Sequence, residues 1–464
     1  MRDIQLTVTH KGSDVISWND DDDVIEEIAD GGIEEVSNER RVTSVEENLD
    51  GTACQITEAI VRADSISSTV IITTNTQTST GAAASYTSSL QRVLLGATTS
   101  NVPRKIYWEF GHPALHNRHM LIFGTSGMGK TYAIQCILCE IAKFKQNSLV
   151  IDYTEGFLPK QLEELTNAVL HPVQHVIRTS PLPMNPFLPY VSDAGGITIA
   201  DDAAAIASRV SSILKSVYQI GEQQYGLLYE AIIEGIQEYH SNMNFSYLLN
   251  MLQEYTEDKN KKNWAYTLIN KIRPFVDRKP FSYGENGYDW DKLFLDKTRL
   301  CNVFQLTRLD REHSLLVTEF VLWDLYGYLQ SHGKKTDPKV IVLDEVQNLN
   351  HDDDRPLAKY LREGRKFGVS LILATQTLSS MKKEERDRIF MAAHKLFFKP
   401  AETEFKTFAE IAALSTGEKQ DDWVDKLRFL GKGECYSIGP SFNADTGKIK
   451  NIAVKIRVSP LADR

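Results

Sequence analysis

The sequence predicts an α/β fold built around a mainly parallel sheet, and three patterns support this prediction. From about residue 103 onward, apolar runs of four to six residues alternate with helical patterns, as expected for buried parallel strands separated by helices. A glycine-rich turn joins the first run to its helix, and one long stretch between two runs is wholly helical in pattern. The expected strands are His119–Phe123, Ser148–Asp152, His175–Arg178, Cys301–Leu306, Val340–Leu343, Ser370–Ala374 and Lys395–Phe398.

The helical stretch divides the predicted core into two parts. Residues 198–296 show no strand signal, and Ala203–Ile220 and Tyr225–Tyr239 have helical periodicity, which indicates an all-helical insertion. The tail returns to β structure at Glu434–Ile438 and Ile452–Val458, which flank a turn-rich loop. The predicted organisation is an N-terminal module at 1–101, the first part of the core at 102–197, the insertion at 198–296 and the second part of the core at 297–464.

The N-terminal module differs from the core in composition. Ile4–Val8 and Val70–Thr74 alternate as strands do, and 14 of the residues from Ser65 to Ser89 are serine or threonine, as in a polar linker. The first 50 residues carry 15 acidic and 4 basic side chains, a net charge of −11. Such an acidic block is typical of a solvated arm, although a DNA-mimicking or partner-docking tail is an alternative interpretation.

The acidic module accounts for the charge of the whole chain. The 464 residues include 52 basic and 62 acidic side chains, for a net charge of −10, so the remaining 414 residues carry +1. The body of the protein therefore offers no electrostatic objection to a polyanionic partner. No apolar run approaches the length of a membrane span, no signal peptide is recognisable, and five cysteines form no disulfide framework. These features predict a cytoplasmic protein without a membrane partner.

A phosphate-binding loop follows the first predicted strand of the core. The segment fits G-x-x-x-x-G-K-[ST], and it lies between an apolar strand and a helical pattern, as phosphate binding requires. Its glycines allow successive backbone N–H groups to point at one anion, and the helix dipole adds to this attraction. Lys130 is expected to reach the β- and γ-phosphates of ATP, and the Thr131 hydroxyl to bind Mg²⁺. The predicted nucleotide-binding residues are Gly124, Thr125, Ser126, Gly127, Met128, Gly129, Lys130 and Thr131.

Two carboxylates end a later strand. Val340–Leu343 runs directly into Asp344 and Glu345. Asp344 is expected to hold Mg²⁺, the Walker B role, and Glu345 to orient and polarise the attacking water. The glutamate favours an ATPase over a kinase that transfers phosphate to a small acceptor. The predicted insertion explains the long separation between Lys130 and Asp344.

The next strand ends in a polar pair, and its preceding helix ends in arginines. Gln376 follows the strand Ser370–Ala374, where open α/β sheets bind ligands, and it is a candidate sensor of the γ-phosphate. Arg362 and Arg365 are candidate arginine fingers that act on the site of a neighbouring subunit. The alternative for either arginine is a solvated helix end, because cations are favoured there by the helix dipole.

Taken together, these motifs resemble the HerA/FtsK superfamily of ring-forming, DNA-pumping ATPases. The segments that carry the resemblance are 117–124 leading into the loop, Leu149-Val-Ile-Asp-Tyr153, Pro183-Met-Asn-Pro-Phe187, Val342-Leu-Asp-Glu-Val-Gln347, Arg362-Glu-Gly-Arg-Lys-Phe-Gly368 with Ala374-Thr-Gln376, and the tail segments 431–435 and 456–461. The resemblance spans roughly residues 105–460. It implies a RecA-like P-loop NTPase core, ATP and Mg²⁺ as cofactors, self-association into a hexameric ring, and translocation on double-stranded DNA beside a nuclease partner.

A narrower resemblance concerns residues 108–119. The segment Trp-Glu-Phe-Gly-His-Pro-Ala-Leu-His-Asn-Arg-His looks like the HerA-like C-terminal part of the DptH proteins of phosphorothioation-dependent DNA restriction. This resemblance implies a role in restriction or anti-phage defence. A second hypothesis from another class is a nucleotide-gated scaffold that assembles a defence complex, with only incidental ATP turnover.

Three weaker features have ordinary alternative explanations. Cys136 and Cys139 lie on the predicted helix after the loop, so packing explains them better than metal binding. The histidines at 112, 116 and 119 lack a completing ligand set for zinc. Basic side chains between Lys259 and Lys279, and again in Lys382–Arg388, are candidates for phosphate contact with DNA, but interspersed acidic residues fit a plain solvated helix equally well.

Overall fold

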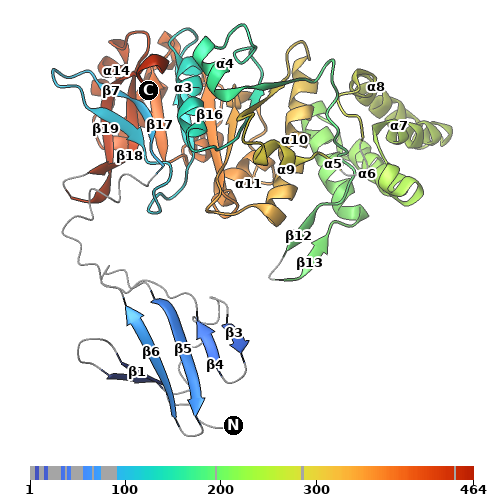
Figure 1. Ribbon diagram of the computed structural model, residues 1–464. Helices are drawn as coiled ribbons and strands as arrows, with labels where there is room; N and C mark the ends of the chain where they lie inside the picture. The colour runs from blue at the N-terminus through green and yellow to red at the C-terminus, as the bar shows by residue number, and fades with distance from the viewer. Residues whose placement is uncertain are drawn as a thin grey trace. The chain divides into compact units, whose positions relative to one another are not determined.

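The computed structural model divides the chain into two compact units, Met1–Ser88 and Ser89–Arg464. Within the first unit it describes the backbone of strands β1–β6 alone, and in the second unit it describes residues 91–193, 196–283, 287–443 and 446–464. Figure 1 shows both units, which are described separately below.

The described strands of the N-terminal unit form one six-stranded sheet. Its order is β2-β1-β6-β5-β4-β3, with β1 and β6 parallel and the other neighbours antiparallel. The strands are β1 (Leu6–Thr9), β2 (Val15–Trp18), β3 (Ile33–Val36), β4 (Glu39–Val42), β5 (Ile56–Asp64) and β6 (Ser67–Thr74). The predicted strands Ile4–Val8 and Val70–Thr74 overlap β1 and β6, whereas most of the acidic block lies outside the described residues.

An eleven-stranded sheet organises the second unit as the structure describes it. Its order is β11-β14-β10-β15-β16-β9-β17-β18-β19-β7-β8. The first seven strands in this order pair in parallel, and the remaining neighbours are antiparallel. The parallel strands are β9 (Met120–Phe123), β10 (Ser148–Asp152), β11 (Val173–Val176), β14 (Cys301–Gln305), β15 (Lys339–Leu343), β16 (Val369–Thr375) and β17 (His394–Phe398). The antiparallel strands are β7 (Val93–Thr98), β8 (Lys105–Trp108), β18 (Glu434–Asn443) and β19 (Lys448–Val458).

The mainly parallel α/β fold predicted from the sequence is therefore confirmed. Each of the seven predicted parallel strands is present within two residues, and the largest shift among them is at β11, which begins two residues before the predicted His175. The two antiparallel strands of the tail are longer than predicted, because β18 ends five residues after Ile438 and β19 begins four residues before Ile452. Apart from β11, which is only partly buried, the parallel strands are buried along almost their whole length and are mainly apolar, which is why their runs are readable in the sequence.

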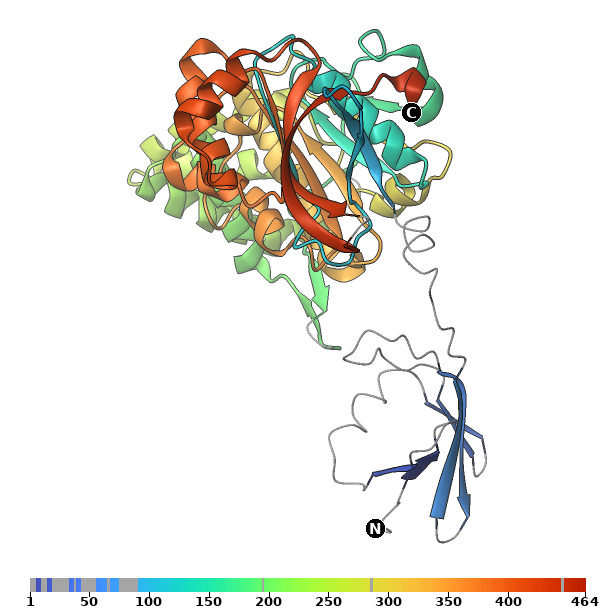
Figure 2. The ribbon, with the colours of Figure 1, turned by 90° about the vertical axis from the view of Figure 1, so that its left-hand side faces the viewer.

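Alternate side chains of the parallel strands enter two different cores. Met120 and Ile122 pack on the side of helix α3, while Leu121 and Phe123 pack on the opposite side. The first side is covered by α3 (Lys130–Ala142) and α4 (Glu164–Leu170). The opposite side is covered by α10 (Arg311–His332), α11 (Pro356–Glu363), α12 (Lys383–Ile389), α13 (Phe405–Thr416) and α14 (Gln420–Arg428). Figure 2 looks along this layering, with α3 and α4 in teal on one side and α13 and α14 in red-orange on the other.

Helices fill the predicted insertion 198–296 except at its start, where Thr198–Ala200 forms a strand (β13) by pairing with the preceding strand, so the prediction of a wholly helical insertion is wrong there. The helices are α5 (Ala203–Tyr218), α6 (Glu222–Tyr239), α7 (Phe245–Glu254), α8 (Lys262–Arg278) and α9 (Trp290–Leu295), preceded by a short hairpin of β12 (Val191–Asp193) and β13 (Thr198–Ala200). Phe245 and Phe275 pack edge to face, and Phe320 of α10 joins them, so these helices share one core with the sheet. In Figure 1, α6, α7 and α8 lie at the end of the sheet away from β7 and β19.

The boundary of the N-terminal unit differs from the predicted position at residue 101. The units divide between Ser88 and Ser89, and β7 and β8 complete the large sheet. Ile456 and Val458 of β19 pair with Thr98 and Gly96 of β7, a contact between residues more than 350 positions apart that local patterns cannot reveal. Among the described residues, no helix has the length and apolar character needed to cross a membrane.

Candidate functional site

The predicted site residues meet at the carboxyl edge of the parallel strands. Thr375 pairs with Phe123 across β16 and β9, and Leu343 pairs with Ile151 across β15 and β10. The loops that follow these four strands therefore leave the sheet together. They bring the phosphate-binding loop, Asp344, Gln376 and a further carboxylate, Asp152, to one edge, where open parallel sheets bind ligands.

The phosphate-binding loop has the backbone geometry that an anion cradle requires. Gly124, Gly127 and Gly129 have φ of 144°, 79° and 109°, in the region that favours glycine. The loop is fixed on both flanks, because Thr125 N–H donates to the Lys399 carbonyl (3.0 Å) and Gly433 N–H donates to the Met128 carbonyl (3.0 Å). Within the described part of the chain, the backbone N–H groups at positions 126–128 have no protein acceptor, so they are free to bind an anion.

Lys130 is the first residue of α3 and is folded back onto this loop. Its ammonium donates to the carbonyls of Gly124 (2.6 Å) and Thr125 (3.1 Å), and the side chain is almost fully buried. Burial lowers the pKa of Lys130, while the nearby carboxylates of Asp344 and Glu345 act in the opposite direction. The ammonium therefore has few compensating contacts, and a phosphate would supply the missing ones.

Thr154 and Asp152 position the Walker B carboxylate. Thr154 Oγ1 donates to Asp344 Oδ2 (2.7 Å), and the Glu345 N–H donates to Asp344 Oδ1 (2.9 Å). Asp152 in turn accepts from the N–H groups of Thr154 (2.9 Å) and Phe157 (2.8 Å), which fixes the loop that carries Thr154. Neither Asp152 nor Thr154 was predicted as a site residue. Asp152 was nevertheless detectable from the sequence, because it ends a buried apolar strand in the same way as Asp344.

The same cluster fits Mg²⁺. A Cβ atom built on Gly156 would lie 3.4 Å from Thr154 Oγ1 and 3.6 Å from Thr131 Oγ1, so the two hydroxyls lie around one point beside Asp344. Burial raises the pKa of Asp344 to about 6, and the adjacent Glu345 carboxylate adds to this rise. A divalent cation would offset this unfavourable charge, and a carboxylate with a hydroxyl is the oxygen donor set that Mg²⁺ prefers. That Thr131 and Asp344 hold the ion stays a prediction.

Glu345 and Gln376 are in direct contact. Gln376 Nε2 donates to Glu345 Oε1, and Gln347 Nε2 donates to Glu345 Oε2. Glu345 is 8% exposed and has φ of 52°, a left-handed conformation that costs a non-glycine residue about 1 kcal/mol or more. The structure therefore brings the predicted base and the predicted sensor together, while Gln347 is an addition that sequence patterns missed.

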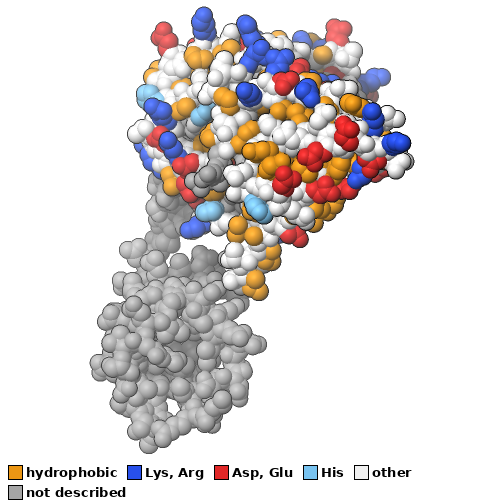
Figure 3. Space-filling view, turned by 90° about the vertical axis from the view of Figure 1, so that its right-hand side faces the viewer, with side chains coloured by type: hydrophobic (Ala, Val, Ile, Leu, Met, Phe, Trp, Pro, Cys, Tyr) orange, Lys and Arg blue, Asp and Glu red, His pale blue; other side chains and the backbone are white. Residues whose placement is uncertain are grey.

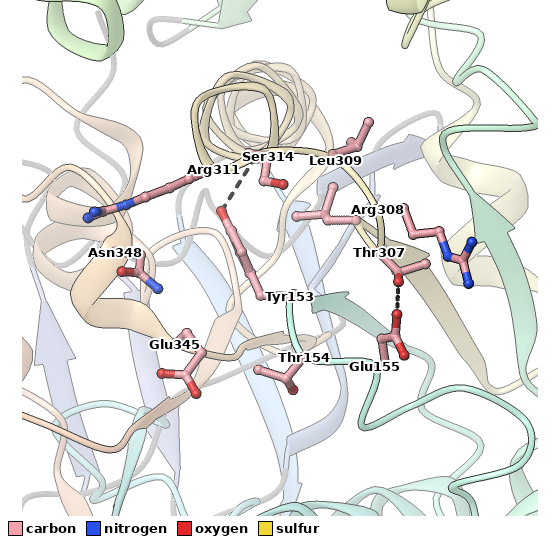
Figure 4. A pocket seen from close by; sticks show the side chains of 11 residues that line it. Tyr153, Thr154, Glu155, Thr307, Arg308, Leu309, Arg311, Ser314, Glu345 and Asn348 are labelled. Atoms are coloured by element: carbon pink, nitrogen blue, oxygen red, sulfur yellow. Dashed lines mark hydrogen bonds between the residues drawn. The ribbon is translucent and has the colours of Figure 1, made fainter.

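A pocket of about 510 Å³ opens beside Glu345. It lies over the ends of β10, β14 and β15, and in Figure 4 Glu345, Asn348 and Arg311 line one side while Glu155, Thr307 and Arg308 line the other. Glu155 and Arg308 also have positive φ, at 63° and 61°. Backbone strain in three residues around one pocket is typical of a functional site.

Comparison with known proteins agrees with this geometry. The family described as Helicase HerA, central domain, matches residues 110–325. A DNA double-strand break repair helicase HerA of Sulfurisphaera tokodaii is 23% identical over 351 residues, which cover 69% of this chain and 62% of the helicase. Over this part of the core the chain is similar to the HerA helicases of the HerA/FtsK superfamily.

Other relatives are more distant. The DNA import protein CedB of Sulfolobus acidocaldarius is 19% identical over 352 residues, covering 72% of this chain and 52% of CedB. Among solved structures, VirB4 of Thermoanaerobacter pseudethanolicus aligns with a TM-score of 0.59 at 14% identity, over 80% of this chain and 98% of VirB4. The plasmid coupling protein TrwB, solved with the non-hydrolysable GTP analogue GDPNP, aligns with a TM-score of 0.50 at 13% identity, over 74% and 85% of the two chains. These two likenesses show the RecA-like fold, and the chain spans about 62% of the length of the HerA it matches.

The two candidate arginine fingers lie apart from the other predicted site residues. Arg362 of α11 donates to the Asp353 carbonyl (2.7 Å) and forms an ion pair with the Asp353 carboxylate (3.6 Å). Arg365, just beyond the helix, is half-buried and lies close enough to Arg118 for the two cations to repel. In the contacts described for this chain, neither arginine bonds to Glu345, Gln376 or the phosphate-binding loop, and their action on a neighbouring subunit stays a prediction.

The weaker features of the sequence have structural roles. Cys136 and Cys139 are buried on α3, and burial raises the pKa of both thiols, as for packing residues. His119 is buried and its Nδ1 accepts from the Leu371 N–H (3.0 Å), and among the described residues no group of side chains could hold a metal through histidine, cysteine or several carboxylates. Lys261 pairs with Glu230 (2.7 Å) and Arg388 with Asp353 (2.6 Å). Figure 3 shows basic and acidic side chains interspersed on the face of the helical insertion.

Proposed function

We propose that this chain is an ATP-driven motor that translocates double-stranded DNA, and that it works as a ring of six copies, as in the family it resembles. The observation that carries the proposal is the contact between Glu345 and Gln376 beside a complete phosphate-binding loop in a HerA-type core. A protein that only senses nucleotide binding needs no water-polarising carboxylate, whereas a hydrolytic motor does.

The proposed hydrolysis uses residues from one edge of the sheet. The N–H groups of the loop and the Lys130 ammonium bind the β- and γ-phosphates of ATP, replacing the Gly124 and Thr125 carbonyls as partners of Lys130. Thr131 and Asp344 would hold Mg²⁺, which would supply positive charge beside the phosphates. Glu345 orients the attacking water, and Gln376 moves from Glu345 to the γ-phosphate. Arg362 or Arg365 of a neighbouring copy stabilises the charge of the transition state.

The wider role proposed is DNA restriction or anti-phage defence beside a nuclease partner. The resemblance of residues 108–119 to the DptH proteins supports it, and the sequence contains no nuclease motif of its own. The competing proposal is a nucleotide-gated scaffold in which turnover is incidental. The names of the matched HerA and CedB relatives, a repair helicase and a DNA import protein, favour the motor.

The first test is ATP turnover with and without duplex DNA. DNA is expected to accelerate wild-type hydrolysis, and Glu345→Gln should lower turnover about 100-fold or more while ATP binding is retained. Glu363→Gln is the matched control, because Glu363 lies on α11 and pairs weakly with Lys366 (3.8 Å) away from the site. A rate that ignores DNA, together with full biological activity of Glu345→Gln, would favour the scaffold.

The second test identifies the arginine finger. Alanine at the true finger, Arg362 or Arg365, should reduce turnover about 1,000-fold and leave ATP binding intact. Each variant is then mixed with a Lys130→Ala chain, which lacks the phosphate-binding ammonium but keeps both arginines. Turnover recovered in the mixture indicates action between subunits, and no recovery at any ratio contradicts it.

A further inference from the structure

Both oxygens of the Glu345 carboxylate accept a hydrogen bond, and the two donors come from different elements. Gln376 reaches Oε1 from the end of β16. Gln347 reaches Oε2 from the short helix η3 (Val346–Asn348), which begins immediately after Glu345. In the proposed mechanism Gln376 must leave Glu345 to contact the γ-phosphate, so Oε1 loses its donor when ATP binds.

Gln347 has an anchor of its own. Its Oε1 accepts a hydrogen bond from Thr375 Oγ1 (2.6 Å), which lies on the buried end of β16. A primary amide has one acceptor end and one donor end, so the bond from Thr375 turns the Gln347 NH₂ toward Glu345. The Thr375 hydroxyl has a single proton, for which Gln347 Oε1 and the Thr377 carbonyl (2.8 Å) compete, and when it donates to Gln347 it holds that amide from the sheet.

Glu345 needs such support because its backbone is strained. With φ of 52°, it lies in the left-handed region, and its carbonyl accepts from the Asn348 N–H (2.9 Å) as the chain turns into η3. A carboxylate at the end of a strained turn is oriented productively only if neighbouring side chains hold it, and a displacement of about 1 Å costs catalysis heavily.

We propose that Gln347 is a positioning residue that keeps Glu345 aimed at the attacking water after ATP draws Gln376 away. Thr375 acts through Gln347 by fixing the direction of its amide. This inference rests on the proposed ATPase function. In it, Gln376 moves when ATP binds, whereas Gln347 stays bonded to Glu345.

The test is a steady-state comparison of the full chain with Gln347→Met, which keeps the length of the side chain and removes its hydrogen bonds. Basal kcat for ATP should fall about tenfold or more, the change that corresponds to one lost hydrogen bond to a charged group. KM for ATP and the affinity for a fluorescent ATP analogue should stay within about twofold, since Gln347 does not touch nucleotide.

Thr375→Val tests the anchor. It should lower kcat less than Gln347→Met does, and the double variant should be no slower than Gln347→Met alone, because Thr375 acts only through Gln347. Thr377→Val is the control, since its hydroxyl bonds to Glu404 and not to the site, although the Thr375 hydroxyl also lies 2.8 Å from the Thr377 carbonyl.

Three results would overturn the proposal: an unchanged kcat in Gln347→Met, a raised KM with unchanged kcat, or a double variant much slower than Gln347→Met. If Gln347→Met fails to bind the ATP analogue, Thr375→Val decides, since an unchanged kcat in that variant also overturns the proposal. A wild-type chain that turns over ATP without response to DNA contradicts the motor alone and leaves this test intact.

Discussion

The pKa values of two buried carboxylates, which lie in different halves of the large sheet, are shifted in opposite directions. In the parallel half, burial and the adjacent Glu345 raise the pKa of Asp344 to about 6. In the antiparallel half, hydrogen bonds from Lys455 (2.8 Å) and Arg457 (2.9 Å) outweigh burial and lower the pKa of Glu434 to about 2. Asp344 in the parallel half has no ion pair among the described residues, although the Lys130 ammonium lies near it, whereas Glu434 in the antiparallel half has two.

This difference separates a site from its support. Uncompensated charge destabilises the free protein and is retained where a ligand will offset it. The antiparallel strands carry no such charge, and they fasten the phosphate-binding loop instead: Gly433 N–H donates to Met128, and the Gly433 carbonyl accepts from Val458 N–H (3.0 Å). Changes in the first half should therefore affect catalysis most, and changes in the second should affect stability most.

The largest effect is expected for Asp344→Asn, with opposite signs for activity and stability. Turnover should fall about 100-fold or more, because a ligand of Mg²⁺ is lost. The free protein should become more stable at pH 7, by about 1–2 kcal/mol, because a buried charge is removed. Thermal unfolding without nucleotide or metal measures the second effect, and a lower melting temperature at pH 7 would contradict the comparison.

The same variant shows how Asp344 contributes to the pH dependence of folding stability. Since the folded pKa, about 6, exceeds the ordinary value of 3.8, the folded state binds a proton first as the pH falls from 7 toward 5, and the wild type is stabilised in that window. Burial also raises the pKa of Glu319, to about 7, so its protonation stabilises wild type and Asp344→Asn alike as the pH falls. The advantage of Asp344→Asn over wild type should therefore shrink between pH 7 and pH 5.

A stability effect of intermediate size is expected for Gly96→Ala. A Cβ on Gly96 would lie 2.2 Å from the Arg457 carbonyl oxygen, so β7 must move away from β19. The free energy of unfolding should fall by about 2–4 kcal/mol. Gly226→Ala in α6 is the matched control, because its Cβ meets no atom within 4 Å and alanine favours a helix. Equal melting temperatures for the two variants would contradict the tight β7–β19 contact.

The smallest effect is expected for Glu434→Gln. Its partners are partly exposed, so the loss of both ion pairs should cost about 1 kcal/mol at pH 7. Because the folded pKa is lowered, the stabilisation from Glu434 is present above the ordinary value of 4.5 and lost as the pH falls toward 2. Glu418→Gln, which removes a surface pair with Lys426, is the control. A large loss of kcat in Glu434→Gln would contradict the division between site and support.

Local patterns reveal the parts of the site that lie on one segment. The loop from Gly124 to Thr131 and the pair Asp344 and Glu345 follow buried apolar strands, and parallel strands bring their carboxyl ends to one edge. Thr154 has no such pattern, because its role is a hydrogen bond to a residue 190 positions away. Gln347 is equally inconspicuous, since the Thr375 hydroxyl that orients it belongs to another strand.

The sequence by itself determined the α/β class, the order of the parallel strands along the chain and the chemistry of the phosphate-binding loop, because each depends on residue types at short spacing. Only the tertiary structure decided that β7 and β8 close the large sheet, that Asp152 and Thr154 fix Asp344, and that Gln347 holds Glu345. These features depend on contacts between residues that are far apart in the sequence. Short patterns of residue types do not reveal such contacts, because folding alone brings the residues together.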